Sequence, residues 1–588
     1  MAFRSQLDTA LPTRPVIPRL LYPRAYHRPG LLDWLEQPRP EYGLRFADDQ
    51  GGWDFWDYPR LAAAVASAAN EITQLRCRPH GVVSIVTRTG PEFIAAFFGA
   101  LLAGNTPSPL AFPLTMRDRD QYVQHAATIL EVADPTLVLA DEAVQDLLTD
   151  AAAQARLQHR PHVLSMREDD VTPRPGIRAE LALLQFTSGS SGRPRGVRVT
   201  WDNVESNIAM IRHWLQIDGE DQVATWLPLY HDMGLIGALL MPVVNQTDVW
   251  IMRPDQFVRD PLRWLECFGS RGVEIGVAPN FGFAYAAKRV DRDAVDGMDF
   301  SRWRTAIVAA ERLDPEALGR FAEQLAHRGF RASSFMPAYG LAEATLAVTG
   351  VGLETVPRTV CLDWSSVRMG EPTVITDEGS LAETQRIGHG DGWLVGCGKP
   401  HPSVSVSIVN ESGEELPERF LGEIAVEGPT VANGYEGADS GSTRFVDSRL
   451  HTGDAGFIDR GELFVVGRLG DSIKVRGRTV FVEDVEARLA MVDGVHKGKC
   501  VVLAGTNAGR AFLVVLVEAE PGDWVAGVTT ILQSEGGADV VINVLAAERG
   551  TIERTSSGKP RRRVLWQAFL DGSLLAQTAY GSSLAGTR

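Results

Sequence analysis

Apolar runs of strand length alternate with helical patterns through the first four hundred residues, and this alternation constrains the fold most strongly. Expected strands lie at 82–86, 136–139, 273–278 and 305–309, and expected helices at 58–75, 91–102 and 315–327. Because strands joined through helices pair most readily in parallel, the pattern predicts an α/β architecture with largely parallel sheets. At 588 residues the chain also exceeds what one core serves, so we expect several subdomains.

From about Ser403 the pattern changes to short strands separated by turns, expected at 404–409, 422–427 and 462–466. They predict a small β-rich subdomain. The stretch 467–471 is the best boundary candidate. We therefore expect an N-terminal domain, residues 1–468, followed by a mobile α+β domain, residues 469–588. The second domain should hold a helix at 482–491 and strands at 500–504 and 512–517.

Charge and cysteine usage exclude several classes of protein. A net charge of −16 argues against a general nucleic-acid binder, which needs a basic face. The five cysteines are scattered without a CxxC pair, which indicates neither a disulfide framework nor a zinc site. The longest apolar stretch, 94–104, is too short to span a bilayer, and the first twenty residues lack the apolar core of a signal peptide. A cytoplasmic location is expected.

Lysine is rare in this chain, with six lysines among 58 basic residues. Whatever bias favours arginine elsewhere has spared these few positions. The scarcity raises the odds that some of the six need an ammonium, which arginine cannot replace.

The segment 181–200, LALLQFTSGSSGRPRGVRVT, places a loop rich in glycine and hydroxyl groups after an apolar run. Glycines allow close backbone approach, and N–H and hydroxyl groups donate to phosphate oxygens, so the loop suits phosphate binding. It is not a Walker A loop, because GxxxxGK[ST] is absent. Taken alone, an ordinary polar turn explains it equally well.

Four further segments follow this loop in order, and the series carries a resemblance. They are WLPLYHDMGLIG from Trp226, AYGLAEATL from Ala338, HTGDAGFIDRGELFVVGRLGDSIKVRG from His451 and TSSGKPRRR from Thr555. Read with TSGSSGRPRGV from Thr187, they resemble the adenylate-forming superfamily of acyl-CoA ligases, amino-acid adenylation domains and luciferases. Any one motif is weak, but five in order are a strong signal.

The resemblance implies roles for most of the candidate residues. Thr187, Ser188, Gly189, Ser190 and Ser191 would hold the phosphates of ATP. The adenine would lie against Tyr339 and Gly340, and Glu343 would bind Mg²⁺. The ribose hydroxyls would donate to Asp454, with Arg468 nearby. An ionised carboxylate suits a diol because it only accepts hydrogen bonds, and both hydroxyl groups of the diol can donate to it. The alternatives are a surface carboxylate for Glu343 and a turn residue for Asp454.

Lys559 is the expected catalytic residue, because the reaction must bring two anions together at the α-phosphate. A compact ammonium on a flexible stem can bridge both. In the same resemblance His231 would lie near the acyl carboxylate, although a lone histidine in an apolar stretch is more often a core residue. Met233, Gly234 and Ile236 would line the acyl pocket, with core packing as the alternative.

Several segments look closest to the fatty acyl-AMP ligase branch: YHDMGLIG, PAYGLAEATL, APNFGFAY and DPLRWLECF. Glu343 and Asp454 lie 111 positions apart, and the surplus, about 353–389, would match an insertion thought to restrain the mobile domain. A surface loop of no mechanistic weight is the alternative. The branch implies a fatty acid substrate and transfer to an acyl carrier protein or carrier domain of a polyketide or nonribosomal peptide synthase.

Departures from the family pattern keep other readings open. Gly470 stands at the hinge position where the family that the chain resembles usually has lysine or aspartate. Ala309 would narrow the adenine slot, and Thr479 and Val482 replace a polar residue and a proline of that family. The alternatives are an acyl-CoA ligase, an enzyme that adenylates an amino or aryl acid, and a non-catalytic scaffold. No acidic partner for a substrate ammonium is evident, which favours a fatty acid.

Overall fold

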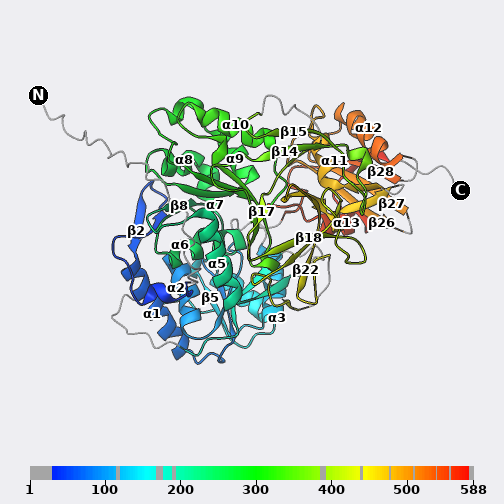
Figure 1. Cartoon of the computed structure of the whole chain (residues 1–588). Helices are drawn as coiled ribbons and strands as arrows, with labels where there is room; N and C mark the ends of the chain where they lie inside the picture. The colour runs from blue at the N-terminus through cyan, green and yellow to red at the C-terminus, as the bar shows by residue number, and fades with distance from the viewer. Residues whose placement is uncertain are drawn as a thin grey trace, which may run out of the picture.

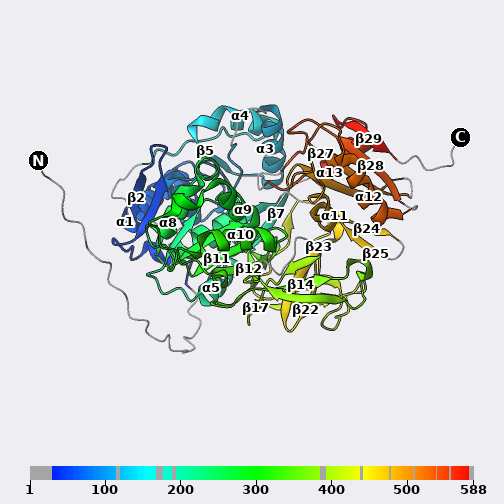
Figure 2. The same cartoon turned by 90° about the horizontal axis from the view of Figure 1, so that it is seen from above.

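The computed structural model describes residues 29–113, 119–166, 176–187, 194–383, 392–437, 442–475, 478–507, 510–537, 540–554 and 558–581. Figures 1 and 2 show the segment after Arg468, coloured orange to red, gathered at one end of the molecule. It lies beside α3 and the strands β14 and β15. The rest of the chain forms the larger body, in which two sheets are surrounded by helices.

The largest sheet has nine strands in the order β17-β13-β12-β11-β10-β8-β9-β1-β2. Neighbouring strands from β12 to β1 pair in parallel. The pairings at the two edges of the sheet, β1 with β2 and β12 with β13 and β17 beyond it, are antiparallel. The bounds are β1 Gly43–Ala47, β2 Trp53–Asp57, β8 Gln222–Thr225, β9 Asp248–Ile251, β10 Ile275–Pro279, β11 Thr305–Ala309, β12 Phe335–Gly340, β13 Ala347–Gly350 and β17 Lys399–Pro400.

Four helices in this region are short and begin with or near proline or a capping side chain: α7 Pro254–Arg259, α8 Pro261–Gly269, α9 Asn280–Arg289 and α10 Pro315–Ala326. The Asp314 carboxylate accepts from the N–H groups of Glu316 and Ala317 and so caps α10. Aromatic side chains fill the space between sheet and helices, with Trp303 stacked on Phe268.

A second, three-stranded parallel sheet is built from β4 Thr106–Pro109, β3 Val82–Val86 and β5 Leu137–Ala140. Beside it lies an antiparallel group of β6 Leu181–Thr187, β7 Arg195–Thr200 and β20 Tyr435–Glu436. The helices of this region are α1 Tyr58–Gln74, α2 Pro91–Leu102, α3 Arg119–Ala133, α4 Gln145–Gln154, α5 Trp201–Leu215 and α6 Met241–Val244.

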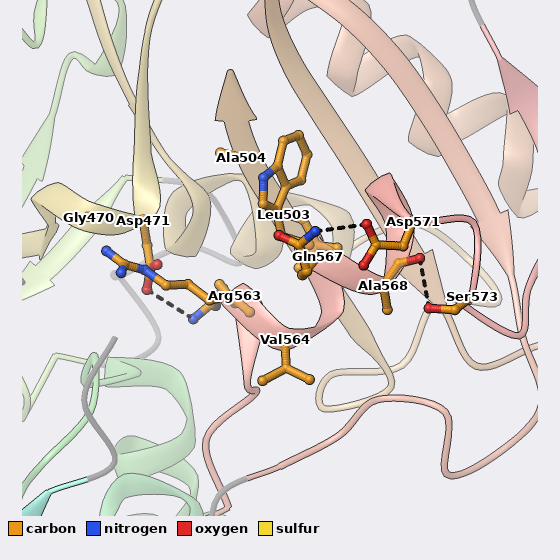
Figure 3. Close-up of a pocket in the computed structure, with 12 residues that line it drawn as sticks. Gly470, Asp471, Leu503, Ala504, Arg563, Val564, Gln567, Ala568, Asp571 and Ser573 are labelled. Atoms are coloured by element: carbon orange, nitrogen blue, oxygen red, sulfur yellow. Dashed lines mark hydrogen bonds and ion pairs between the residues drawn. The ribbon is translucent and has the colours of Figure 1, made fainter. Parts of the chain in front are cut away.

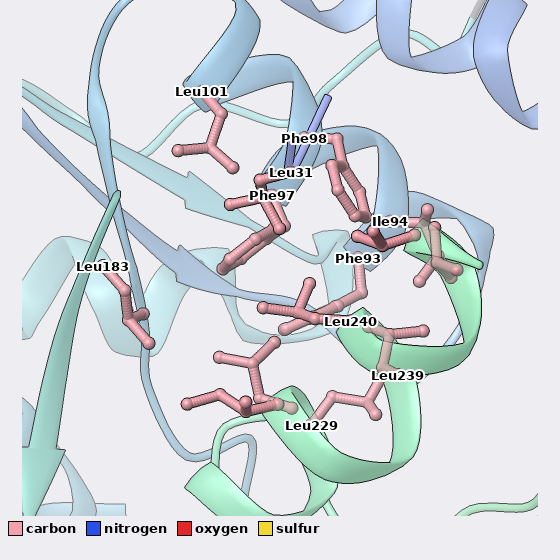
Figure 4. Packing of buried hydrophobic residues seen from close by; sticks show 14 of the residues in the cluster. Leu31, Phe93, Ile94, Phe97, Phe98, Leu101, Leu183, Leu229, Leu239 and Leu240 are labelled. Carbon is pink, nitrogen blue, oxygen red and sulfur yellow. The ribbon is translucent and has the colours of Figure 1, made fainter. Parts of the chain in front are cut away.

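Helix α2 is apolar on nearly every side and is therefore buried rather than amphipathic. Figure 4 shows Phe93, Phe97 and Phe98 of α2 packed against Leu239 and Leu240. None of the helices in the ranges given above is long and apolar enough to cross a membrane.

The β-rich part contains two small sheets. One has β18 Ser405–Val409, β19 Gly422–Glu427, β21 Arg444–Val446, β22 Arg449–Asp459 and β23 Glu462–Arg468. The other is an antiparallel sheet of β15 Ile375–Ser380, β14 Arg358–Leu362 and β16 Trp393–Val395. The described residues 353–383 of the predicted surplus segment contain the strands β14 and β15 with a 3₁₀ turn between them, and its residues 384–389 lie outside the described part.

The segment after Arg468 begins with the hairpin β24 Ser472–Val475 and β25 Arg478–Phe481. A four-stranded sheet follows, in the order β26-β27-β28-β29, covered by three helices. The bounds are β26 Cys500–Asn507, β27 Arg510–Val517, β28 Val540–Ala546, β29 Gln577–Gly581, α11 Val482–Leu489, α12 Trp524–Gly536 and α13 Arg562–Leu570. These elements have their own hydrophobic core, which includes Val485, Leu513 and Leu532.

The predicted α/β class with a following α+β segment is confirmed. Helix α2 and strands β3, β11 and β19 have the predicted bounds, while the strand expected at 136–139 begins one residue later. One feature was not predicted: residues Met233–Leu240 form a π-helix leading into α6. Single π turns often accompany functional sites.

Candidate active site

The predicted phosphate loop connects β6 to β7, with Thr187 opposite Arg195 in the register. Residues Ser188, Gly189, Ser190 and Ser191 lie outside the described ranges. Thr187 lies at the mouth of the loop, and its buried hydroxyl has no hydrogen-bond partner among the described residues. A hydroxyl held in this way is available to a ligand oxygen.

Glu343 lies in a 3₁₀ turn directly after β12 and is buried. The Tyr435 hydroxyl donates to its Oε1 at 2.7 Å, and Nη2 of the buried Arg195 lies 3.7 Å from the same oxygen. The Arg195 guanidinium stacks on the Tyr435 ring, 4.3 Å from its centre. Strands β7 and β20, which carry these two partners, are neighbours in one sheet. The Glu343 carboxylate is thus fixed on one side by a phenol and a cation.

A second buried carboxylate, Asp454 in β22, lies opposite Arg468 of β23. The Tyr339 hydroxyl donates to Asp454 Oδ2 at 2.7 Å, and Arg468 Nε donates to Oδ1 at 2.8 Å. Burial and the adjacent carboxylate raise the pKa of Tyr339 well above its ordinary value, so the phenol keeps its proton and donates. Asp454 likewise raises the pKa of Arg468. The three side chains form one rigid, charged group.

Gly340, predicted to face the adenine, follows Tyr339 at a bulge between β12 and β13. A Cβ atom at this position would lie 1.9 Å from the carbonyl oxygen of Leu346, so no larger residue fits. The backbone at the end of β12 can therefore approach its neighbour closely, which holds Tyr339 in place.

The predicted acyl-site segment begins at His231 and runs into the π-helix. His231 Nδ1 lies 2.5 Å from Asp232 Oδ1, and the Met233 N–H donates to the same oxygen at 2.8 Å. Met233 and Ile236 are buried in the hydrophobic clusters. A Cβ atom on Gly234 would lie 2.2 Å from the Pro228 carbonyl oxygen, so this glycine permits a close turn.

Lys559 comes from a distant part of the sequence, yet it lies within electrostatic range of Asp232, Asp454, Glu311 and Arg468. Lys559 is exposed to solvent, although the surrounding protein still desolvates its ammonium. Desolvation and the Arg468 charge lower the pKa of Lys559, and the three carboxylates oppose this effect. Residues about 330 positions apart in the chain thus meet in one site.

Four residues of the site were not predicted: Arg195, Asp232, Glu311 and Tyr435. Asp232 had a signal, because it adjoins His231 in the motif. Glu311 accepts from the Phe281 N–H at 2.7 Å, and burial raises its pKa. Arg195 also had a signal, because it lies in the motif that begins at Thr187. Nothing in the sequence indicated Tyr435, whose place beside Arg195 depends on the pairing of β7 with β20.

The predicted hinge, Gly470, lies in a 3₁₀ turn and lines a cavity of about 620 Å³ between this turn, β26 and α13. Figure 3 shows Asp471 on the side of this cavity that carries Arg563. The cavity does not include any residue of the Asp454 or Glu343 groups. All the residues that line it come after Arg468, so it belongs to the C-terminal segment and not to the candidate reaction site.

Comparison with known proteins assigns the class. The family model described as AMP-binding enzyme matches residues 39–436, so the chain belongs to the AMP-binding enzyme family. A Caulobacter vibrioides protein described as an acyl-CoA synthetase is 30% identical, over 88% of this chain and 90% of its own. The long-chain-fatty-acid–AMP ligase FadD26 of Mycobacterium marinum is also 30% identical, and the match covers 91% of this chain and 95% of FadD26.

A solved structure agrees with these relatives. It comes from a study of fatty acyl-adenylate ligases from E. coli and L. pneumophila, and superposes with a TM-score of 0.81 at 30% identity. The match covers 93% of this chain and 99% of the other. The resemblance read from the five motifs is confirmed at the level of the family and of this branch.

Proposed function

We propose that this protein is a fatty acyl-AMP ligase, which activates a fatty acid with ATP and releases pyrophosphate. The observation that carries the proposal is that Lys559 lies within electrostatic range of Asp454 and of Arg468, which are hydrogen-bonded to each other. A ribose-binding carboxylate and a mobile ammonium in one place suit the attack of a carboxylate on a nucleotide phosphate. The relatives described above support the fatty acid as substrate.

The chemistry follows from the charges of the reactants. A fatty carboxylate oxygen forms a bond to the α-phosphorus while the bond to pyrophosphate breaks, and pyrophosphate leaves with the electron pair. Both reactants are anions, so the ammonium of Lys559 between them lowers the barrier as negative charge gathers in the transition state. Asp454 and Tyr339 hold the nucleoside, so that the phosphate presents the face opposite the leaving group.

Glu343 fits a single-carboxylate ligand for Mg²⁺, which proteins usually hold through one or two carboxylates together with substrate phosphates. Its carboxylate is buried and oriented by Tyr435 and Arg195. When bound, Mg²⁺ would neutralise phosphate charge. The residues of the chain then orient the acid and the nucleotide around it.

We propose further that the acyl group passes to the phosphopantetheine thiol of a carrier protein. The thiol gives up its proton to solvent, its sulfur forms a bond to the acyl carbon, and the acyl–phosphate bond breaks, so that AMP leaves with the electron pair. We place the domain boundary after Arg468, with Gly470 as the hinge about which residues 469–588 rotate between the steps. Rotation would withdraw Lys559 and open the acyl-adenylate to the thiol. A cytoplasmic location is part of this proposal.

The strands of the surplus segment support a restraint on this rotation. The Thr479 N–H donates to the Val367 carbonyl at 3.4 Å, and Phe481 packs in one hydrophobic cluster with Val360 and Val367. These contacts join the segment to the hairpin that follows the hinge. Rotation must break them, so the insertion would favour the adenylating orientation.

An acyl-CoA ligase is the second candidate, since one relative carries that description. Mass spectrometry of the products from ATP, Mg²⁺ and a mixed pool of acids tests both. Acyl-AMP from long-chain acids is expected, with thioester on a phosphopantetheinylated carrier but not on CoA. Rapid formation of acyl-CoA would favour the second candidate, and adenylates of amino or aryl acids alone would refute the fatty acid assignment.

A further inference from the structure

The loop that joins β11 to α10, residues 310–314, is fixed to the larger body at both of its ends. The Glu311 carboxylate accepts from a backbone N–H of α9 at 2.7 Å, and the Asp314 N–H donates to the side-chain oxygen of Asn280 at 3.0 Å. Ala310 has a φ of 76°, in the left-handed region that residues with a side chain rarely adopt. The contacts around this docking loop must therefore hold it in one conformation.

Two side chains of the docking loop reach the C-terminal segment, which comprises the described residues after Arg468. Arg312 Nη2 lies 3.8 Å from Asp484 Oδ1 of α11, and Asp314 Oδ2 lies 2.5 Å from Lys497 Nζ. A cation and an anion of the loop thus pair with an anion and a cation of the segment. A placement that exchanged the two contacts would bring like charges together, so the two pairs specify one orientation.

The ion pair of Arg312 with Asp484 is the more buried of these two contacts. Its side chains are 18% and 7% exposed, whereas the side chain of Lys497 is 68% exposed. Salt screens a partly buried pair less than an exposed one, and removing one partner of a buried pair is more costly. We therefore expect Arg312 to contribute more than Lys497 to the placement of the C-terminal segment.

Asp484 connects Arg312 to the interior of the C-terminal segment. Arg488 Nε lies 3.5 Å from Asp484 Oδ2, and Arg488 Nη2 lies 2.5 Å from Glu535 Oε1 of α12. Arg478 of β25 also pairs with Glu535. Charges of alternating sign thus run from the docking loop through α11 and α12 to β25. The position of Asp484 is therefore coupled to that of the C-terminal segment as a whole.

Arg312 also contacts the surplus segment, through Trp364 in the 3₁₀ turn between β14 and β15. The carbon of its guanidinium lies 5.1 Å from the centre of the Trp364 ring, within the range of a cation–π contact. Helix α11 lies near β14 in both views of the molecule (Figures 1 and 2). Arg312 is therefore placed where the larger body, the surplus segment and the C-terminal segment meet.

We propose that Arg312 is a positioning residue, which sets the orientation of the C-terminal segment through its ion pair with Asp484. The inference rests on the proposed function for its kinetic consequences, because adenylation would need Lys559 to be brought in by that segment. The orientation of the segment can be measured without any substrate.

The substrate-free test is a zero-length carbodiimide cross-link between Lys497 and Asp314, whose charged groups lie 2.5 Å apart in this orientation. Mass spectrometry of the digested whole protein quantifies the linked peptides. R312M keeps an unbranched apolar side chain beside Trp364 but removes the charge, and it should lower the yield of the cross-link several-fold.

An unchanged yield in R312M overturns the proposal, even if the enzyme adenylates fatty acids. Absence of the cross-link from the wild type would show that the segment does not lie in this orientation, and would overturn it as well. Failure of the wild type to adenylate fatty acids refutes the proposed function and leaves the cross-linking result standing.

The kinetic test compares the two half-reactions in the same variants. Pyrophosphate exchange by R312M should fall about 10- to 100-fold, the scale for misplacing a reacting group by roughly an ångström. Transfer from synthetic acyl-AMP to the carrier should not fall, because the segment must leave this orientation for that step. An equal loss of both half-reactions would overturn the proposal.

A double-mutant cycle tests whether Arg312 acts through Asp484. D484N should lower pyrophosphate exchange as R312M does, and the double variant should be no slower than the slower of the two single variants. Losses that multiply in the double variant would show that the two residues act independently, and would overturn the proposal.

A matched control separates positioning from folding. Arg304 forms an ion pair with Asp221 at 2.9 Å, and these side chains are 19% and 7% exposed, but both residues belong to the larger body. R304M should lower the melting temperature without changing the yield of the cross-link or the ratio of the two half-reactions. If R304M and R312M change both readouts alike, the effect of R312M is structural and the proposal is wrong.

Discussion

The two halves of the active site are built in opposite ways. On the side of the larger body, Tyr339 and Asp454 are buried, and the Tyr339 hydroxyl donates a hydrogen bond to Asp454 at 2.7 Å. Glu343 is also buried and accepts a hydrogen bond from Tyr435. On the other side, Lys559 is exposed and comes from the segment beyond the hinge. The first half is fixed by packing and hydrogen bonds, whereas the second lies within electrostatic range of the first.

Under the proposed function, this difference would let one site serve two reactions. Side chains that hold the nucleoside would stay in place through both steps, as side chains built into paired strands can. The ammonium would be needed only for adenylation, and electrostatic attraction can be broken at less cost than buried packing. Lysine serves this purpose repeatedly: Lys474 pairs with Glu411 at 2.6 Å and Lys497 with Asp314 at 2.5 Å, both across the junction.

The largest effect is expected from a variant that removes the ammonium of Lys559, the charged group of the second half of the site. Lys559→Ala should lower acid-dependent pyrophosphate exchange about 100- to 1000-fold, the scale for losing one aimed electrostatic group. ATP binding, measured by calorimetry, should change little, because the fixed half holds the nucleoside. Near-normal pyrophosphate exchange in this variant would show that Lys559 is not needed for adenylation, and would contradict the contrast drawn between the two halves of the site.

The next test loosens the fixed half. Tyr339→Phe removes the donor to Asp454 and should cost about 1.5–3 kcal/mol, as for hydrogen bonds to charged groups. Both half-reactions should weaken together through poorer nucleotide binding, and thermal unfolding should begin earlier. A loss confined to adenylation would mean that Tyr339 acts with Lys559 and not with the nucleoside.

The junction between the halves should respond to pH through Glu483. Burial raises the pKa of this carboxyl to about 7, although Arg562 favours its charge. The protonated form is favoured in the folded state, so the stabilising contribution is full below the unfolded pKa of about 4.3 and is lost as pH rises through about 7. Glu483→Gln should therefore raise stability at pH 8 by about 1–2 kcal/mol.

Urea unfolding at pH 5 and pH 8 measures this effect, since the gain should be larger at the higher pH. Glu486→Gln is the matched comparison: this glutamate accepts two hydrogen bonds at 2.8 Å from the same Arg562, so its loss should destabilise. Equal stability of Glu483→Gln and wild type at both pH values would show that the carboxyl ionises normally.

The smallest effect is expected at the exposed cross-junction pair. Lys497→Met removes the ion pair to Asp314 and should change stability by at most about 1 kcal/mol, as for other exposed pairs. Adenylation should fall slightly in low salt and not at all in high salt, because salt screens the interaction. A large, salt-independent loss would show that packing and not charge orients the moving half.

Motif order was sufficient to predict the class and the fold, and the residues of the proposed site stay predictions. Tyr339, Glu343, Asp454 and Lys559 each lie in a motif whose residue types match the chemistry, and helix α2 and strand β3 could be bounded from their apolar runs. These features are local in sequence, because proline, glycine and periodicity act over a few residues. The surplus segment was identified by length alone, and its strands were not predicted.

What the sequence determined by itself is which chemical groups the protein carries and which secondary structure each short segment prefers. Only the tertiary structure decided which groups meet. Arg195 and Tyr435 meet at Glu343 because β7 pairs with β20, and Lys559 comes within electrostatic range of Asp454 although the two are 105 positions apart in the chain. Such contacts depend on strand pairing and packing over hundreds of residues, and no local preference encodes them.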